Sequence, residues 1–109
     1  MRFLNDTVIA TQSIAGDVQS AAIDASQMVY ATAQIVSTST AAGTLKLQGS
    51  NDFKNPTNWN DIPNATASVS SAGAVTIPVT QTCFKWIRVT YTHTSGSGNG
   101  TVVLQAQTF

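Results

Sequence analysis

The chain has 109 residues and a mass of 11.4 kDa, which is the size of one domain with one hydrophobic core. Five Lys and Arg balance five Asp, Glu is absent, and charged residues make up 9% of the chain against about 25% in average soluble domains. This composition removes the electrostatic basis for a nucleic-acid or membrane partner, and a hydrophobic content of 42% argues against wholesale disorder.

Residues 1–6 are interpreted as an N-terminal arm at the start of the domain. Phe3 and Leu4 are followed at once by polar residues, so the segment lacks the apolar core of a secretory signal peptide. No run approaches the roughly 18 apolar residues of a membrane-spanning helix. We therefore expect a protein made in a cytoplasm and not exported by a classical signal on this chain.

Residues 17–27 leave two alternatives open. Their Ala and Gln residues permit a short helix, but the small side chains form no apolar stripe, so a weak strand around residues 20–23 is favoured. The next segment, residues 28–35, alternates strictly and predicts a strand. Its apolar face consists of Val29, Ala31, Ala33 and Ile35.

Residues 43–49 alternate Leu with Lys or Gln, which is typical of a strand with one solvated face. The stretch that follows, residues 50–64, is rich in Asn, Asp and Pro. These residue types supply turns and caps, so we predict an ordered loop. Its apolar anchors are expected to be Phe53, Trp59 and Ile62.

Residues 74–79 predict another strand, with Ile77 and Val79 on its apolar face. Pro78 has no N–H to donate to a neighbouring strand, so this strand is expected at the edge of a sheet. Just beyond it lies Cys83, the only cysteine, which cannot form an internal disulfide. Its apolar neighbourhood favours a reduced thiol in the core.

Residues 84–93 form a strand whose apolar face changes sides between Trp86 and Ile87. Two explanations are open: a β-bulge at this point, or a central strand that is covered on both faces. In either case Trp86 is expected to lie in the core.

Residues 94–100 are rich in Gly and predict a hairpin loop before a last strand at residues 101–109. Thr, Val and Ile together supply 33 residues, and these β-branched side chains favour sheets over helices. We predict an all-β protein. Residues 1–109 should form a single jelly-roll-like antiparallel β-sandwich of about eight strands.

Few residues suggest catalysis. His93 is the only histidine and Glu is absent, so neither a catalytic triad nor a zinc site has its partners. Calcium accepts carboxylate and amide oxygens such as those of Asn51, Asp52 and Asp61, but their spacing matches no EF-hand and turn capping explains both Asp residues. We predict a non-enzymatic protein with no catalytic, cofactor-binding or metal-binding residue.

The candidate binding residues are Trp59 and its neighbours Asn58 and Asn60. An indole ring offers an apolar face for a sugar ring, and Asn side chains bond hydroxyl groups. The alternative is that Trp59 folds back onto the core and holds the long loop down.

Three segments of the sequence resemble those of a known class of proteins. Residues 47–52 (LQGSND), residues 58–63 (NWNDIP) and residues 86–89 (WIRV), the last followed by a Gly-rich hairpin, resemble small β-sandwich structural proteins of tailed bacteriophage particles. The resemblance covers roughly residues 43–109, and discoidin-like and carbohydrate-binding sandwiches share its late-strand signature. It implies a virion component: a capsid decoration (cement) protein that binds and stabilises the shell, or a tail accessory subunit.

The resemblance implies partners in the virion: the major capsid protein, other virion subunits and further copies of this chain in a homo-oligomer. Thr-, Gln- and Asn-rich faces suit such contacts because they hydrogen-bond without burying charge. Phe3, Leu4 and Phe109 are candidate interface residues, since apolar ends gain from being covered. The rival function is a carbohydrate-binding module or tail accessory protein that holds host glycans through Trp59 and its Asn neighbours.

Overall fold

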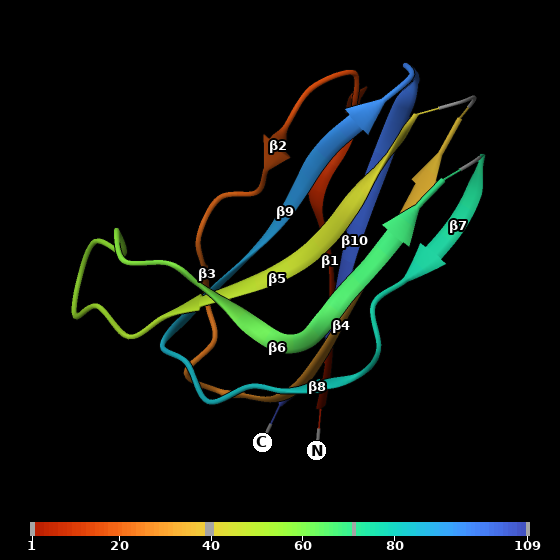
Figure 1. Cartoon of the computed structure of the whole chain (residues 1–109). Coiled ribbons are helices and arrows are strands. Elements are labelled where there is room, and N and C mark those ends of the chain that lie inside the picture. The colour runs from red at the N-terminus through yellow and green to blue at the C-terminus, as the bar shows by residue number, and fades with distance from the viewer. Residues whose placement is uncertain (1, 39–40, 71, 109) are drawn as a thin grey trace.

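The computed structural model describes residues 2–38, 41–70 and 72–108, with side chains from residue 4 onward. Ten strands in these ranges form two antiparallel sheets packed face to face (Figure 1). The all-β sandwich is therefore confirmed, with ten strands in place of about eight. In the described ranges no helix is long and apolar enough to cross a membrane.

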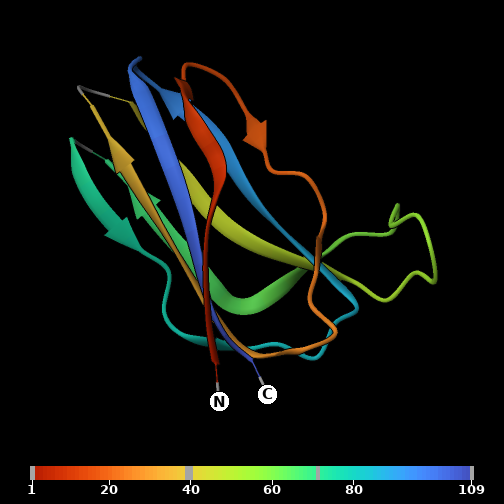
Figure 2. The same cartoon turned by 180° about the vertical axis from the view of Figure 1, so that it is seen from behind.

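The sheet that lies behind in Figure 1 and in front in Figure 2 is called sheet A. Its strands, in order, are β1 (Arg2–Ser13), β10 (Asn99–Thr108), β4 (Met28–Ser37) and β7 (Gly73–Thr76), with β8 (Thr80–Gln81) also paired to β4. The other, sheet B, consists of β2 (Val18–Gln19) and β3 (Ile23–Asp24) on one side of β9 (Trp86–Ser95), followed by β5 (Ala42–Ser50) and β6 (Asn60–Val69).

The core lies between the two sheets and is built by period-two alternation. On β4, β5, β9 and β10 every second residue is buried, and the residues between them face solvent. The inward side chains with no accessible surface include Ile35, Leu45, Leu47, Ile87, Val89 and Leu104. The solvated face predicted for residues 43–49 is confirmed, and the last strand predicted from residue 101 onward is present as β10, with one dry and one wet side.

The N-terminal segment belongs to sheet A. Residues 2–6 form the start of β1, with Arg2 opposite Thr108 and Asp6 opposite Leu104, so they are a paired strand and not a free arm. The first and last strands therefore lie side by side, and the two chain ends emerge together (Figure 2).

Residues 17–27 form no helix. They make the two short strands β2 and β3 along β9, on either side of residues 20–22, where the sequence favoured one weak strand. Residues 74–79 do lie at the edge of sheet A, but β7 ends at Thr76. From there the chain crosses the end of the sandwich (Figure 1), so Val79 is 71% exposed and Cys83 is exposed as well. The core positions predicted for these two residues are wrong.

The change of apolar face near Trp86 reflects the place where the strand begins. β9 starts at Trp86, and Phe84, which precedes it, packs its ring against Gly49 at the margin of the core. Trp86 itself is half-buried, and its Nε1 donates a hydrogen bond to the carbonyl oxygen of Asp52 at 3.1 Å. The core position predicted for Trp86 is therefore wrong, because the side chain anchors the long loop instead.

Candidate functional site

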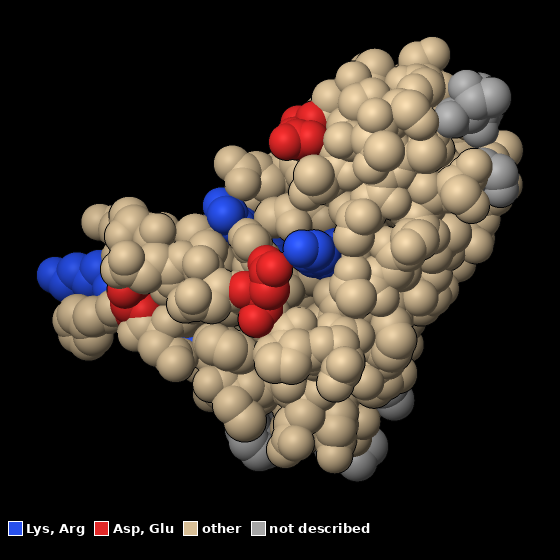
Figure 3. All heavy atoms as spheres, viewed as in Figure 1, with Lys and Arg blue, Asp and Glu red and all other residues tan. Residues whose placement is uncertain are grey.

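The two outer faces of the sandwich differ sharply in charge. On sheet A, strand alternation turns outward Asn5, Thr7, Tyr30, Thr32, Gln34, Val36, Thr76, Thr101, Val103, Gln105 and Gln107. None of these described side chains is ionic. Several charged side chains lie on the outer face of sheet B and on its projecting loop (Figure 3). In sheet A, Asp6 is exposed on the edge strand β1, but it pairs with Leu104 and so belongs to the set that alternation turns away from the outer face.

A polar network crosses sheet B from β6 through β5 to β9. Gln48 faces both Asp61 and Arg88 in the strand register, and its Nε2 donates to Asp61 Oδ1 at 2.9 Å. Lys46 Nζ lies 3.1 Å from the other oxygen of Asp61. These hydrogen bonds from Gln48 and Lys46 hold the pKa of Asp61 below its ordinary value.

Trp59 lies on this network and not between the sheets. Its ring is half-buried, and the guanidinium carbon of Arg88 is 4.5 Å from the ring centroid, within the range of a cation–π contact. Trp59 is absent from the hydrophobic core cluster of the described residues. The indole therefore fastens the loop to the outer face of sheet B, and Arg88 occupies one face of the ring.

The two Asn residues that flank Trp59 lie at the end of the loop and at the start of β6. The side-chain amide of Asn58 donates to Asp52 Oδ1 at 3.1 Å within the loop. Asn60 is two residues from the buried Ile62, so alternation along β6 places its side chain on the opposite side from Trp59. Alternation thus turns Asn60 away from Trp59, and the sugar-binding platform expected from these three residues stays a prediction.

Phe53 is another expected anchor that the structure places elsewhere: its side chain is 82% exposed, so of the three expected apolar anchors only Trp59 and Ile62 pack against the sandwich. Among the candidate interface residues, Leu4 lies in β1 and is 38% exposed. The backbone of Phe3 pairs with Gln107, but its side chain, like all of Phe109, lies outside the described residues.

The loop is held together by one carboxylate. Asp52 Oδ2 accepts hydrogen bonds from the backbone N–H of Thr57 at 2.7 Å and of Asn58 at 2.9 Å. These bonds, with that from the Asn58 side chain, lower the pKa of Asp52 well below 3.8. Asp52 and Asp61 thus belong to two separate hydrogen-bonding groups, and no cluster of three or more metal-ligating His, Cys, Asp or Glu side chains occurs in the described ranges.

The low pKa of Asp52 predicts a pH-dependent loop. Because the folded pKa lies below the unfolded value, the stabilisation is present above pH 3.8 and declines as pH falls toward the folded pKa. The protection of the Thr57 and Asn58 amides against hydrogen exchange should therefore fall in acid, relative to that of amides in β5. Asp52→Asn should lower the protection of the same two amides at neutral pH. Equal protection of these two amides in wild type and variant at pH 7 would contradict this role.

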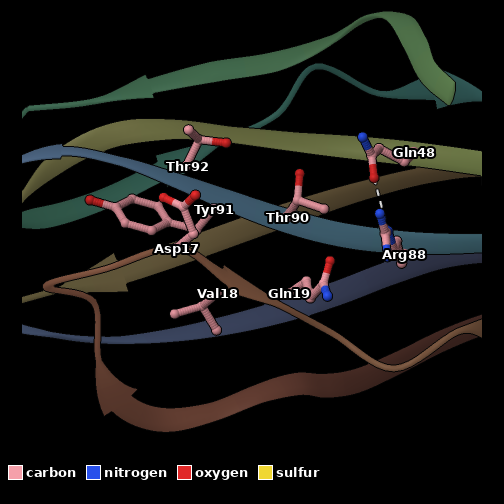
Figure 4. Close-up of a pocket in the computed structure, with 8 residues that line it drawn as sticks. All are labelled: Asp17, Val18, Gln19, Gln48, Arg88, Thr90, Tyr91 and Thr92. Carbon is pink, nitrogen blue, oxygen red and sulfur yellow. Dashed lines mark hydrogen bonds between the residues drawn. The ribbon is translucent and has the colours of Figure 1, made fainter. Parts of the chain in front are cut away.

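A polar trough of about 380 Å³ runs along β9 on the outer face of sheet B (Figure 4). It is lined by Asp17, Val18, Gln19, Gln48, Arg88, Thr90, Tyr91 and Thr92. Arg88 Nε donates to Gln48 Oε1 at 2.8 Å at one end, and Asp17 stands at the other (Figure 4). Asp17 is fixed there because its Oδ1 accepts the backbone N–H of His93 at 2.7 Å.

His93 and Tyr91 lie beneath the Asp17 end. Their rings are 6.4 Å apart, and neither the Tyr91 hydroxyl nor His93 Nδ1 finds a hydrogen-bond partner among the described residues. Burial, with a smaller contribution from the Asp17 charge, raises the pKa of Tyr91.

Sequence reasoning missed the trough. The available signal was the polar series Arg88, Thr90 and Thr92, which alternates with Ile87, Val89 and Tyr91 along the predicted strand.

No protein-family model and no curated protein matches the sequence. Among solved structures, the PBSX exported protein XepA superposes with a TM-score of 0.77 at 10% identity, over 97% of this chain. This chain spans only 37% of XepA. The SPBc2 prophage-derived protein YomS gives a TM-score of 0.57 at 12% identity, over 96% of this chain and 92% of YomS.

A protein of the disulfide-linked pili that form Bacillus endospore appendages gives a TM-score of 0.53 at 16% identity, over 98% of this chain and 89% of that one. At such low identities these likenesses show a shared fold. This chain is therefore a small β-sandwich of the architecture also found in XepA, in the prophage-derived YomS and in a spore-appendage pilin.

Proposed function

We propose that this protein is a non-enzymatic structural subunit of a phage particle, namely a capsid decoration protein that binds and stabilises the shell. The observation that carries the proposal is the ion-free outer face of sheet A. The sequence motifs shared with phage sandwich proteins and the fold shared with the prophage-derived YomS support it. Its partners are the major capsid protein or other virion subunits, and neighbouring copies of the chain.

The composition of this face suits a protein interface. Interface cores are depleted in charged residues, and neutral hydrogen-bonding groups can be covered without the cost of burying an ion. Three exposed apolar side chains lie on or beside the face and gain from being covered: Tyr30 at 41% exposure, Val36 at 48% and Val79 at 71%. Leu4 lies in β1 of the same sheet, at the end where the first and last strands pair, and Phe3 and Phe109 are further candidate contacts.

The area of the outer face of sheet A also suits a docking contact. The four strands β1, β10, β4 and β7 contain 12, 10, 10 and 4 residues. At a strand spacing of about 4.8 Å and a rise of about 3.4 Å per residue, they give a projected area on the order of 600 Å², which suits a modest interface for one subunit. Contacts of this size become effective when the symmetry of a shell repeats them many times.

Placing a cation on this face should abolish docking. Gln34→Arg and Gln105→Arg each put an unpaired charge into the proposed contact, and burying it costs enough to weaken binding by at least tenfold. The measurement is co-sedimentation of the purified variants with phage particles, together with the heat resistance of those particles.

Ser68→Arg is the matched control, because Ser68 is exposed on the outer face of sheet B. It should bind like wild type, and all three variants should keep the wild-type melting temperature. Normal binding by both Gln variants, or an equal loss with Ser68→Arg, would reject sheet A as the docking face.

A further inference from the structure

We propose that the polar trough on the outer face of sheet B binds a short acidic oligosaccharide, whose carboxylate is held by Arg88. This site differs from a Trp59 stacking platform, since Trp59 is outside the trough lining and one face of its ring is already occupied by Arg88.

The Arg88 side chain is held in a fixed position that suits the binding of an anion. Its Nε is bonded to Gln48 Oε1, and its guanidinium plane is held over Trp59, so the side chain is already fixed before a ligand arrives. Gln48 is held in turn by Asp61. A guanidinium whose Nε is engaged still offers its two terminal nitrogens, and their parallel N–H groups match a carboxylate.

The positive charge of Arg88 is not neutralised by the neighbouring side chains. Among the described residues two ion pairs form, Lys46 with Asp61 and Lys85 with Asp24, and Arg88 takes part in neither. Its hydrogen-bonding partner, Gln48, is neutral. A half-buried cation with a neutral partner favours an anionic ligand more than a cation that already has a carboxylate beside it.

The rest of the trough suits hydroxyl groups. Thr90 stands between Arg88 and Asp17 (Figure 4), with Thr92 and Gln19 beside them, and all three side chains can both donate and accept hydrogen bonds. Arg88 and Thr92 are four positions apart on β9, which is about 14 Å at the rise of an antiparallel strand. The lining contains no apolar pocket for a peptide side chain, so a chain of sugars fits better than a peptide.

The two ends of the trough set the orientation of the ligand. Asp17 would repel a second acidic group but can accept hydrogen bonds from hydroxyl groups through its remaining oxygen, so the acidic sugar belongs at the Arg88 end. Because sheet B faces away from sheet A, a subunit docked through sheet A would keep this trough open.

The test uses the isolated full chain and therefore does not depend on docking to a particle. Binding of 3′-sialyllactose is measured by amide chemical shifts and calorimetry, with lactose as the neutral match and trigalacturonic acid as a second acidic probe. We expect at least one acidic probe to shift amides of β9 and β2, and to bind at least tenfold more tightly than lactose.

Three variants locate the binding. Arg88→Gln should reduce the affinity for the acidic probe at least tenfold, while Thr92→Val, which leaves the Trp59 contact intact, should reduce it severalfold. Lys85→Gln is the control, because it removes a cation that lies outside the trough, and its affinity should match wild type.

Several results would overturn the assignment. One is the absence of amide shifts in β9 with both acidic probes at about 10 mM, a concentration that would detect even weak binding. The second is that lactose binds as tightly as the acidic probes. The third is that Lys85→Gln loses as much affinity as Arg88→Gln. Tighter binding of an acidic tetrapeptide at the same amides would assign the trough to a protein partner instead.

Discussion

Leu47→Ala is expected to lower the free energy of unfolding by about 2–5 kcal/mol. Leu47 lies in the central strand β5, has no accessible surface, and faces Val89 across the sheet. Its removal leaves a cavity between two sheets that are tied together by many other side chains and cannot close over it. In a domain of this size each kcal/mol corresponds to about 4–8 °C, so a melting curve followed by circular dichroism should show the loss clearly.

Leu47→Met is the control for this substitution. It changes the shape of the side chain but nearly conserves its volume, so the loss should stay below about 1.5 kcal/mol. If Leu47→Ala melted within 2 °C of wild type, the space between the sheets would not be the packed core described here.

Gly43→Ala is the second substitution with a large expected effect. A Cβ at position 43 would lie 2.3 Å from the backbone oxygen of Thr92 and 2.7 Å from the hydroxyl oxygen of Tyr91. The Tyr91 ring is buried and reaches the space that the missing side chain leaves on β5. Because the nearest obstacle is backbone, β5 and β9 would have to separate locally, at a cost of about 3 kcal/mol, the upper end for overpacking.

Gly16→Ala provides the matched comparison. A Cβ at Gly16 would meet nothing within 4 Å, so the free energy of unfolding should stay within about 0.5 kcal/mol of wild type. Urea unfolding of the two variants measures the difference directly. Equal stability of Gly43→Ala and Gly16→Ala would contradict the close approach of Tyr91 to β5.

Alternation along the sequence was sufficient to predict β4, β5, β9 and β10, because each of them has one dry and one wet side. It did not predict β1 or β6, whose residues 2–6 and 60–64 were expected to belong to an arm and to a loop. It failed where the chain leaves a sheet. Val79 continues the apolar series of its segment, yet it is exposed because the chain turns away at Pro78. A periodic pattern identifies which side chains share a face, but it does not say whether the opposite sheet extends far enough to cover them.

The polar network on sheet B was beyond sequence reasoning for a different reason. Gln48 is 40 residues from Arg88 and 13 residues from Asp61, and they meet only because three strands align in one particular register. Register depends on the whole sheet and cannot be derived from one strand. Trp59 was singled out correctly as a notable side chain of the loop, but its contact with Arg88 follows from that same register.

We expect the two outer faces to have different roles: sheet A attaches the subunit to the shell, and sheet B remains exposed to solvent. Cryo-electron microscopy of phage particles decorated with the purified protein tests this account most directly. It predicts that the outer face of sheet A, with Gln34 and Gln105 at its centre, contacts the shell while the β9 trough is open to solvent. Particles whose subunits dock through sheet B, or which bind no protein at saturating concentration, would contradict it.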